Sequence, residues 1–234
     1  MNLPFKMIVE NEIEQWRASS FFSKEPETLE WIADFKKDAI FFDIGSNIGL
    51  YALYCATLYP NSLIFAFEPV PCNYIRLLQN IALNGFDNII ALPLGMSGIT
   101  RLDVMYEISN EIGHSGSLIN NLPEKEIKKS YLVPATTVDD FVRTWNIFPN
   151  HIKIDIDAGE HDVIVGGYLT LLNRELESCL IEVNDHKKEI VQIFDATGFT
   201  LDNRFNDLLY HSRYRRKNEE GNTAENVIFT RREI

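Results

Sequence analysis

The most informative stretch of the chain is Ile40-Phe41-Phe42-Asp43-Ile44-Gly45-Ser46-Asn47-Ile48-Gly49-Leu50-Tyr51. Its apolar first half predicts a buried strand, and the two glycines predict a turn that opens directly into a helix. Glycine has no Cβ and tolerates positive φ, so such a turn lets backbone N–H groups approach a ligand. The helix that follows would add unpaired N–H groups and a partial positive charge. Asp43 adds an acceptor for an ammonium or hydroxyl group, so the expected ligand carries groups of both kinds.

Length and composition narrow the class of protein. The chain has 234 residues, of which 45% are hydrophobic, and this favours one α/β domain. Its 22 basic and 34 acidic residues give a net charge of −12, which argues against broad binding to nucleic acids or anionic membranes. Scattered cysteines and the lack of a long apolar run predict a cytoplasmic protein without a disulfide framework, a zinc site or a membrane span.

Strand-like and helix-like patterns alternate along the chain. Strands are predicted at 39–44, 63–67, 88–94, 151–156 and 178–184, and helices at 49–59, 71–84, 138–145, 160–173 and 186–197. Residues 1–38 form a helical N-terminal segment, 99–135 an inserted hairpin with a polar loop, and 199–205 with 226–231 a final antiparallel pair. The alternation predicts a doubly wound, mostly parallel sheet in a single domain over residues 1–234. Ligands of such sheets bind outside the carboxyl ends of the strands.

A second acidic residue narrows the ligand. Glu68 ends the second predicted strand and follows Gly45 by 23 residues, close to the spacing of a carboxylate that binds ribose hydroxyls. The nicotinamide fingerprint fails, because Asn47 and Leu50 occupy two of its three glycine positions. A phosphate-binding P-loop is absent as well. The pattern therefore favours an adenosine-type ligand such as S-adenosylmethionine.

Four segments together resemble the FkbM-type S-adenosylmethionine-dependent methyltransferases. They are Ser23-Lys24-Glu25-Pro26-Glu27-Thr28-Leu29-Glu30-Trp31-Ile32, Phe42-Asp43-Ile44-Gly45-Ser46-Asn47-Ile48-Gly49, Phe67-Glu68-Pro69 and Ile152-Lys153-Ile154-Asp155-Ile156-Asp157-Ala158-Gly159-Glu160. The resemblance runs from about residue 17 to residue 231 and implies the class I methyltransferase fold, whose seven-stranded sheet has an antiparallel last strand. One departure is that the family usually shows Glu-Gly-x-Glu where this chain has residues 157–160. Another is Ser46 in place of the commoner alanine.

The resemblance also implies a cofactor site. Its expected members, from the methionine end to the adenine, are Asp43, Gly45, Ser46, Asn47 and Gly49, then Glu68 and Pro69 at the ribose, then Gly95, Met96 and Ser97. Asp155 would lie beside the sulfonium. Glu25 and Thr28 either close the methionine end or cap a helix, and the two interpretations weigh equally.

Transfer of a methyl group to a hydroxyl requires a group that removes the hydroxyl proton. Asp155 and Asp157 are candidates, because they lie two residues apart at the end of a strand. His186, after the next strand, is another candidate, and the loop residue His114 is a weaker one. Lys153 lies in the same apolar strand and needs a carboxylate partner there.

Two further features leave alternatives open. Asp155, Asn184 and Asp185 could together supply oxygen ligands to Mg²⁺, with Asp157 as the base, although FkbM-type proteins are not generally regarded as metal-dependent. The basic run at residues 213–217 is either a clamp for phosphate or carboxylate, for instance of a sugar nucleotide, or a solvated loop.

The sequence therefore predicts an S-adenosylmethionine-dependent methyltransferase that methylates a small molecule or glycan, with a sugar or secondary-metabolite hydroxyl as the acceptor. N-methyl transfer, the Mg²⁺-dependent reaction and a non-catalytic binding subunit are the alternatives. No readable motif names the acceptor, the methylated atom or the oligomeric state.

Overall fold

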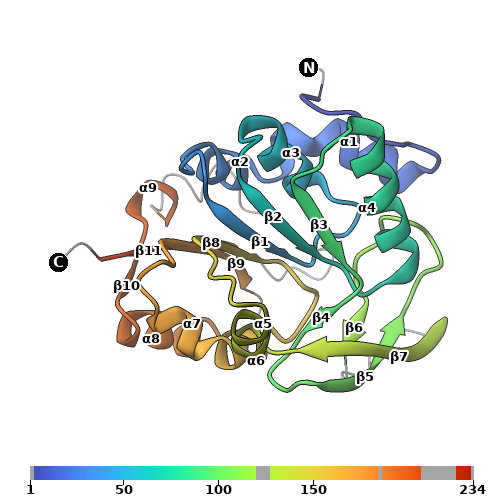
Figure 1. Cartoon of the computed structure of the whole chain (residues 1–234). Helices are drawn as coiled ribbons and strands as arrows, with labels where there is room; N and C mark the ends of the chain where they lie inside the picture. The colour runs from blue at the N-terminus through green and yellow to red at the C-terminus, as the bar shows by residue number, and fades with distance from the viewer. Residues whose placement is uncertain (1–2, 120–126, 184–185, 207–224, 233–234) are drawn as a thin grey trace.

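A seven-stranded sheet forms the centre of the computed structural model, which describes residues 3–119, 127–183, 186–206 and 225–232 (Figure 1). The strand order is β10-β11-β9-β8-β1-β2-β3. Its strands are β1 (Ile40–Ile44), β2 (Leu63–Phe67), β3 (Ile89–Leu92), β8 (His151–Ile154), β9 (Ser178–Val183), β10 (Phe199–Leu201) and β11 (Glu225–Arg231). The pairs from β3 to β9 are parallel, whereas β11 is antiparallel to both of its neighbours. The predicted doubly wound sheet with an antiparallel last strand is confirmed.

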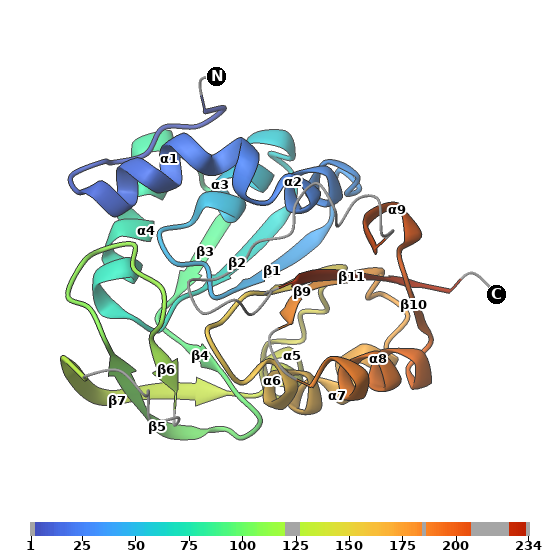
Figure 2. The ribbon, with the colours of Figure 1, turned by 180° about the vertical axis from the view of Figure 1, so that it is seen from behind.

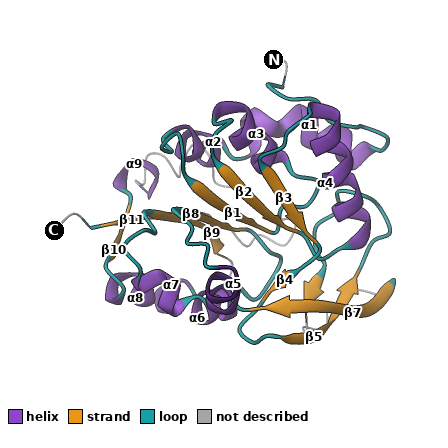
Figure 3. Ribbon diagram, in the orientation of Figure 1, coloured by secondary structure: helices purple, strands orange, loops and turns teal. Residues whose placement is uncertain are grey.

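Helices cover both faces of this sheet (Figures 1 and 3). One layer contains α1 (Glu12–Lys24), α2 (Pro26–Ala33), α3 (Leu50–Leu58), α4 (Pro71–Asn84) and the short α9 (Asn203–Asn206). The other layer contains α5 (Val138–Trp145), α6 (Glu160–Gly166), α7 (Tyr168–Leu172) and α8 (Lys187–Ala196). Pro26 begins α2, since its ring cannot continue α1. Two elements depart from the sequence prediction: the helix predicted at 160–173 is divided at Gly167, and the strand predicted at 199–205 ends at Leu201, where α9 follows.

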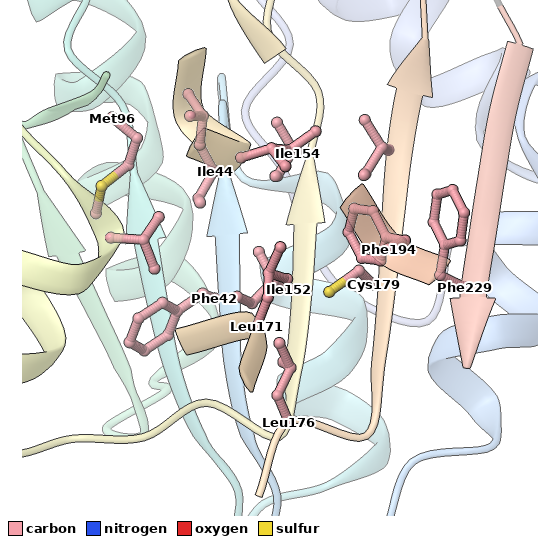
Figure 4. Close-up of a cluster of buried hydrophobic side chains, with 14 of the residues drawn as sticks. Phe42, Ile44, Met96, Ile152, Ile154, Leu171, Leu176, Cys179, Phe194 and Phe229 are labelled. Atoms are coloured by element: carbon pink, nitrogen blue, oxygen red, sulfur yellow. The ribbon is translucent and has the colours of Figure 1, made fainter. Parts of the chain in front are cut away.

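The strands divide their side chains between two hydrophobic cores. Phe42, Ile44, Ile152 and Ile154 belong to the core beneath α5–α8 (Figure 4), and Phe41 belongs to the core beneath α1–α4. Successive side chains of a strand point to opposite faces. Asp43 and Lys153 therefore share the α1–α4 face with Phe41, and both are almost fully buried there. The buried polar groups of the sheet consequently lie on the N-terminal helical side.

A second sheet stands beside the first, at the lower right of Figure 1. It consists of β4 (Gly95–Met96), β5 (Arg101–Glu107), β6 (Leu118–Ile119) and β7 (Lys129–Thr136), in the order β4-β7-β5-β6. The predicted hairpin within residues 99–135 is formed by β5 and β7, which are antiparallel. Gly95 and Met96 extend this sheet by pairing with β7, so the segment after β3 is more ordered than a loop.

Candidate active site

The glycine turn after β1 is tied to the end of β2. Gly45 and Asn47 have φ values of 81° and 51°, which place both in the left-handed region. The N–H groups of Gly45 and Ser46 both donate to the carbonyl of Phe67 at 3.0 Å, and that of Asn47 donates to Glu68 Oε2 at 2.8 Å. These three N–H groups of the turn are therefore satisfied within the protein, by the last carbonyl of β2 and by the side chain of Glu68.

Glu68 is held firmly between two loops. Its Oε2 accepts from Asn47 and its Oε1 accepts from the N–H of Val70, each at 2.8 Å. Burial raises the pKa of this carboxyl to about 7, although both hydrogen bonds act to lower it. The acid predicted to bind ribose hydroxyls is thus fixed in place at the carboxyl end of β2.

A cavity of about 340 Å³ opens at the carboxyl ends of β1, β2, β8 and β9. Among the predicted site residues, ten line it: Gly45, Ser46, Asn47, Glu68, Pro69, Gly95, Met96, Ser97, Asp155 and Asp157. Its size is within the range of small-molecule sites, and its wall mixes apolar side chains with a few polar ones, as such sites do. The structure thus brings together segments that are up to 112 residues apart in sequence (Gly45 to Asp157).

Three predicted residues lie elsewhere. Asp43 is fully buried beneath the turn, and neither of its carboxylate oxygens receives a hydrogen bond from the described residues. Gly49 lies against α4, where a Cβ would collide with the side chain of Leu77. His186 is exposed at the start of α8, and its ring lies 5.3 Å from that of His161 rather than on the cavity wall. The structure therefore gives His186 no contact with the cavity.

Lys153 organises the charges below the cavity. Its ammonium lies 2.6 Å from Asp155 Oδ2 and 4.7 Å from the ring centroid of Tyr51. Burial opposes ionisation of Asp155, but the attraction of Lys153 outweighs it and lowers the pKa of this carboxyl. The predicted carboxylate partner of Lys153 is therefore Asp155, which stays ionised as the half-buried anion beside a buried lysine.

A further carboxyl, that of Glu182, lines the cavity next to this pair. In the parallel register of β8 and β9, Ile154 pairs with Ile181, so the residues that follow them are neighbours at the sheet edge. Burial, followed by repulsion from Asp155 and Glu25, raises the pKa of Glu182 to about 8. Glu182 therefore carries its proton through much of the neutral pH range.

The loop between β5 and β6 rises from the second sheet to α1 (Figure 2). We call residues 111–117 of this loop the strap. Side chains hold its backbone from several sides: Asn11 Nδ2 donates to the carbonyl of Ile112 at 3.1 Å, Arg17 Nε to that of Gly113 at 2.6 Å, and Asn47 Nδ2 to that of His114 at 3.0 Å. The strap thus joins the N-terminal helix to the glycine turn, and both His114 and Ser117 line the cavity.

Asp157 anchors the other end of the strap. Its Oδ2 accepts from the N–H of Ser117 at 3.1 Å. The surrounding protein raises the pKa of Asp157 to about 6, and the charge of Asp155 adds to this rise, although the residue keeps contact with solvent. Asp157 therefore has two roles. It holds the strap through a hydrogen bond, and it presents to the cavity a carboxyl group that is mainly ionised at neutral pH.

Sequence reasoning missed the contribution of α1. Arg17, Ser20, Phe21 and Lys24 line the cavity from this helix, and we call them the α1 wall. Their spacing of three and four residues places them on one face of the helix, but a face that packs into a core has the same spacing. Glu25 and Thr28 are fully buried behind the wall, where the hydroxyl of Thr28 lies 3.3 Å from Glu25 Oε2, and neither lines the cavity.

Several predictions fall outside what the structure describes. Asn184, Asp185 and the basic run at 213–217 lie in undescribed segments. Among the residues with defined positions, no three His, Cys, Asp or Glu side chains are grouped so that they could hold a metal ion. Within the same residues, no helix has both the length and the apolar character that crossing a bilayer requires.

The fold and the site define a class I, Rossmann-like methyltransferase: a mostly parallel seven-stranded sheet with one reversed strand, and a cavity at its carboxyl edge. Residues 43–215 match the model of the methyltransferase FkbM domain, so the chain belongs to the FkbM methyltransferase family.

Named relatives agree with this assignment. The chain is 35% identical over 196 residues to Methyltransferase 1 of Beauveria bassiana, covering 73% of this chain and 76% of the relative. It is 27% identical over 164 residues to the hexuronic acid methyltransferase AglP of Haloferax volcanii, covering 69% of this chain. The match spans 63% of the length of that archaeal protein.

Solved structures share the fold at low sequence identity. The methyltransferase FkbM of Methylobacillus flagellatus superposes with a TM-score of 0.53 at 13% identity, over 95% of this chain and 56% of that one. An rRNA methylase of Streptococcus thermophilus gives a TM-score of 0.51 at 13% identity, over 97% and 99% of the two chains. At this identity the likeness concerns the fold alone.

Proposed function

We propose that the enzyme transfers the methyl group of S-adenosylmethionine to a hydroxyl group of a sugar or a secondary metabolite. The observation that carries this proposal is one cavity that combines the fixed carboxyl of Glu68 with acids at the ends of β8 and β9. A carboxylate at the end of the second strand suits ribose hydroxyls, and Met96, Met105 and Ile119 offer apolar surface for an adenine. An acidic floor suits the ammonium and sulfonium groups of the donor.

The donor supplies an electrophilic methyl group on a positively charged sulfur. The part of the protein is to hold the acceptor in line with that methyl group, to exclude water and to take up the hydroxyl proton. Lys153 keeps the carboxylate of Asp155 ionised and fixed in position, so Asp155 can stabilise positive charge without exchanging a proton. A paired aspartate of lowered pKa is a weak base, so its proposed role is electrostatic.

Two carboxyl groups qualify as the proton acceptor. Asp157 and Glu182 both line the cavity, with pKa values of about 6 and about 8. The pH profile of kcat/KM separates them, because activity should rise with a midpoint near the pKa of the group that acts as base. Asp157→Asn and Glu182→Gln are the matching variants, and the variant of the true base should lose about 10²- to 10⁴-fold in kcat while binding the donor.

The acceptor class is argued from the relatives. One of them is named a hexuronic acid methyltransferase, and this supports a sugar hydroxyl as the target in the present enzyme. A polar wall from α1 and the strap is compatible with a hydroxylated acceptor.

Calorimetric titration with S-adenosylmethionine and S-adenosylhomocysteine tests the donor. We expect binding of both, and an affinity for the donor that falls about tenfold in Glu68→Gln, because hydrogen bonds to a charged group are lost. Glu177→Gln is the control, since Glu177 pairs with Lys36 far from the cavity wall. Failure of the unaltered protein to bind either compound would remove the proposal. Transfer of labelled methyl groups to a panel of sugars and uronic acids then identifies the acceptor.

A further inference from the structure

Arg17 lines the cavity, and among the described contacts only the Nε of its guanidinium makes a hydrogen bond. It lies on α1, half-buried, and its Nε donates to the carbonyl of Gly113 at 2.6 Å. Within the described ranges, the two terminal nitrogens make no hydrogen bond or ion pair with protein groups. The Nε bond fixes the plane of the guanidinium, and the paired terminal N–H groups have the geometry that grips both oxygens of a carboxylate.

The charges along the cavity make this cation unusual. Five carboxyl groups line the cavity, those of Glu68, Asp155, Asp157, Asp162 and Glu182. Two cations face them, Arg17 and Lys24, and Lys24 lies 2.6 Å from the buried carboxylate of Glu25. Arg17 is close enough to Glu68 and Asp157 to lower the pKa of each, but among the described contacts it is ion-paired with neither. In the α1 wall, Arg17 is therefore the cation that can form an ion pair with an anion entering this acidic cavity.

We propose that Arg17 is the carboxylate-binding residue of the cavity. The inference rests on the proposed function, because S-adenosylmethionine carries one carboxylate beside an ammonium and a sulfonium group. The acids of the floor attract the two positive groups and repel the carboxylate, which leaves Arg17 as its partner. An acidic acceptor, such as a uronic acid, is a second source of the same chemical group.

This role is separate from the family motifs. The family match begins at residue 43, whereas Arg17 precedes it on a helix outside the matched region. Arg17 also has a structural role, because it binds the strap. The test must therefore distinguish loss of a carboxylate contact from a loosened strap.

Asn11 provides the matched control. Its Nδ2 donates to the strap at Ile112, one residue from the contact of Arg17, and it does not line the cavity. Its Oδ1 also caps α1 by accepting from Glu14. Asn11→Ser keeps an N-cap acceptor but removes the strap bond, so it reports what a loosened strap does to ligand binding.

The experiment is calorimetric titration of the unaltered protein, Arg17→Met, Arg17→Lys and Asn11→Ser with S-adenosylmethionine and its decarboxylated analogue. We expect Arg17→Met to weaken S-adenosylmethionine by about tenfold to a hundredfold and to leave the analogue, which has no carboxylate, within about twofold. Arg17→Lys should recover part of the loss, because it keeps the charge without the fork. Asn11→Ser should affect both ligands equally.

A second arm identifies the source of the carboxylate. D-glucuronate and D-glucose are titrated into the complex with S-adenosylhomocysteine. If Arg17→Met spares S-adenosylmethionine but weakens glucuronate alone, the carboxylate is that of the acceptor and the inference stands. If Arg17→Met alters carboxylate and carboxylate-free ligands equally, or alters none, the inference is overturned while the proposed function survives. If the unaltered protein binds no S-adenosylmethionine, the proposed function falls and the inference with it.

Discussion

The two ends of the cavity are built by different means. The turn end, made of residues 45–47 and Glu68, is held by hydrogen bonds from its backbone N–H groups to the carbonyl of Phe67 and the side chain of Glu68. The acid end, made of Asp155, Glu182 and Lys24 above Lys153, is held by charged side chains from three elements. The turn end has one arrangement fixed by backbone geometry. The acid end depends on a balance between burial and charge, so its protonation can respond to pH and to a bound cation.

The largest effect is expected where the two ends touch. Gly45 has a φ of 81°, and a Cβ there would collide with the backbone carbonyl oxygen of Asp155. The backbone of Asp155 is itself held in place, because its N–H donates to the carbonyl of Ile44. Gly45→Ala should therefore destabilise the fold by about 4 kcal/mol, as measured by urea unfolding, since neither backbone can move freely.

Gly85→Ala is the matched control for this clash. Gly85 also has positive φ, 68°, at the end of α4, but a Cβ there would meet no atom within 4 Å. Gly85→Ala should lower the free energy of unfolding by only about 1 kcal/mol, which is the cost of placing alanine in the left-handed conformation. Equal losses in the two variants would show that the turn end does not depend on close packing against β8.

The next largest effect should come from the acid end. Lys153 is 1% exposed and neutralises Asp155 directly, with Asp43 as its neighbour in the register of β1 and β8. Lys153→Met leaves buried carboxylates without a cation, so we expect a loss of about 3 kcal/mol in the free energy of unfolding.

Lys36→Met is the comparison for a lysine in a surface pair. Lys36 lies 2.6 Å from Glu177, but its side chain is 75% exposed. The expected loss is below about 1 kcal/mol, because water and salt screen such pairs. If the two lysine variants lost equal stability, burial would not be what makes the Lys153 pair strong.

The difference between the two ends also explains what could be predicted from the sequence. The strands, the reversed last strand and the positions of Gly45 and Glu68 follow from short patterns that are local in the chain. The partner of Lys153 was predictable because Asp155 is two residues away on the same strand face. These features depend on near neighbours in sequence.

The rest depends on residues that only the fold brings together. Glu182 owes its raised pKa to burial beside Asp155 and Glu25, which come from distant segments. Arg17 shares a helical face with Phe21, a core residue, so its spacing alone does not separate a cavity wall from a core stripe. The strap has no periodicity, and its place is set by side chains such as Asn11 and Asn47.

One carboxyl group at each end, Glu182 at the acid end and Glu68 at the turn end, should make stability fall as the pH rises above neutrality. The folded-state pKa of Glu182 is about 8 against an ordinary value of 4.5, and that of Glu68 is about 7. A raised folded pKa means that the folded state holds the proton more tightly, so this stability is complete below about pH 4.5 and is lost as the pH rises to about 8. Each group contributes a loss of up to about 1.4 kcal/mol per pH unit only while the pH is below its folded pKa, so between pH 6.5 and 8 the larger share comes from Glu182.

Urea unfolding of the ligand-free protein at pH 6.5, 7.0, 7.5 and 8.0 measures this slope. His151, whose pKa is lowered to about 3 by burial, opposes this slope at the lower end of the window, because an ordinary histidine is half protonated at pH 6.5 in the unfolded state. The slope between pH 7.5 and 8.0 is therefore the one that reports on the carboxyl groups. Lys24, Lys153, Asp155 and Glu25 are the charged groups that act on Glu182. Glu182→Gln should flatten the slope, and an unchanged slope in this variant would mean that Glu182 is already ionised at neutral pH.

The smallest effect is expected at Ser46, in the turn end. Its hydroxyl donates to the carbonyl of Asp43 at 2.6 Å, within its own turn, although the residue borders the cavity. Removing one such hydrogen bond by Ser46→Ala should cost about 1 kcal/mol in unfolding free energy. The affinity for S-adenosylmethionine should stay within about threefold, because the backbone bonds of Gly45 and Asn47 remain. A larger loss of affinity in calorimetric titration would show that this hydroxyl turns from Asp43 to the donor, and that the turn end also uses side chains for recognition.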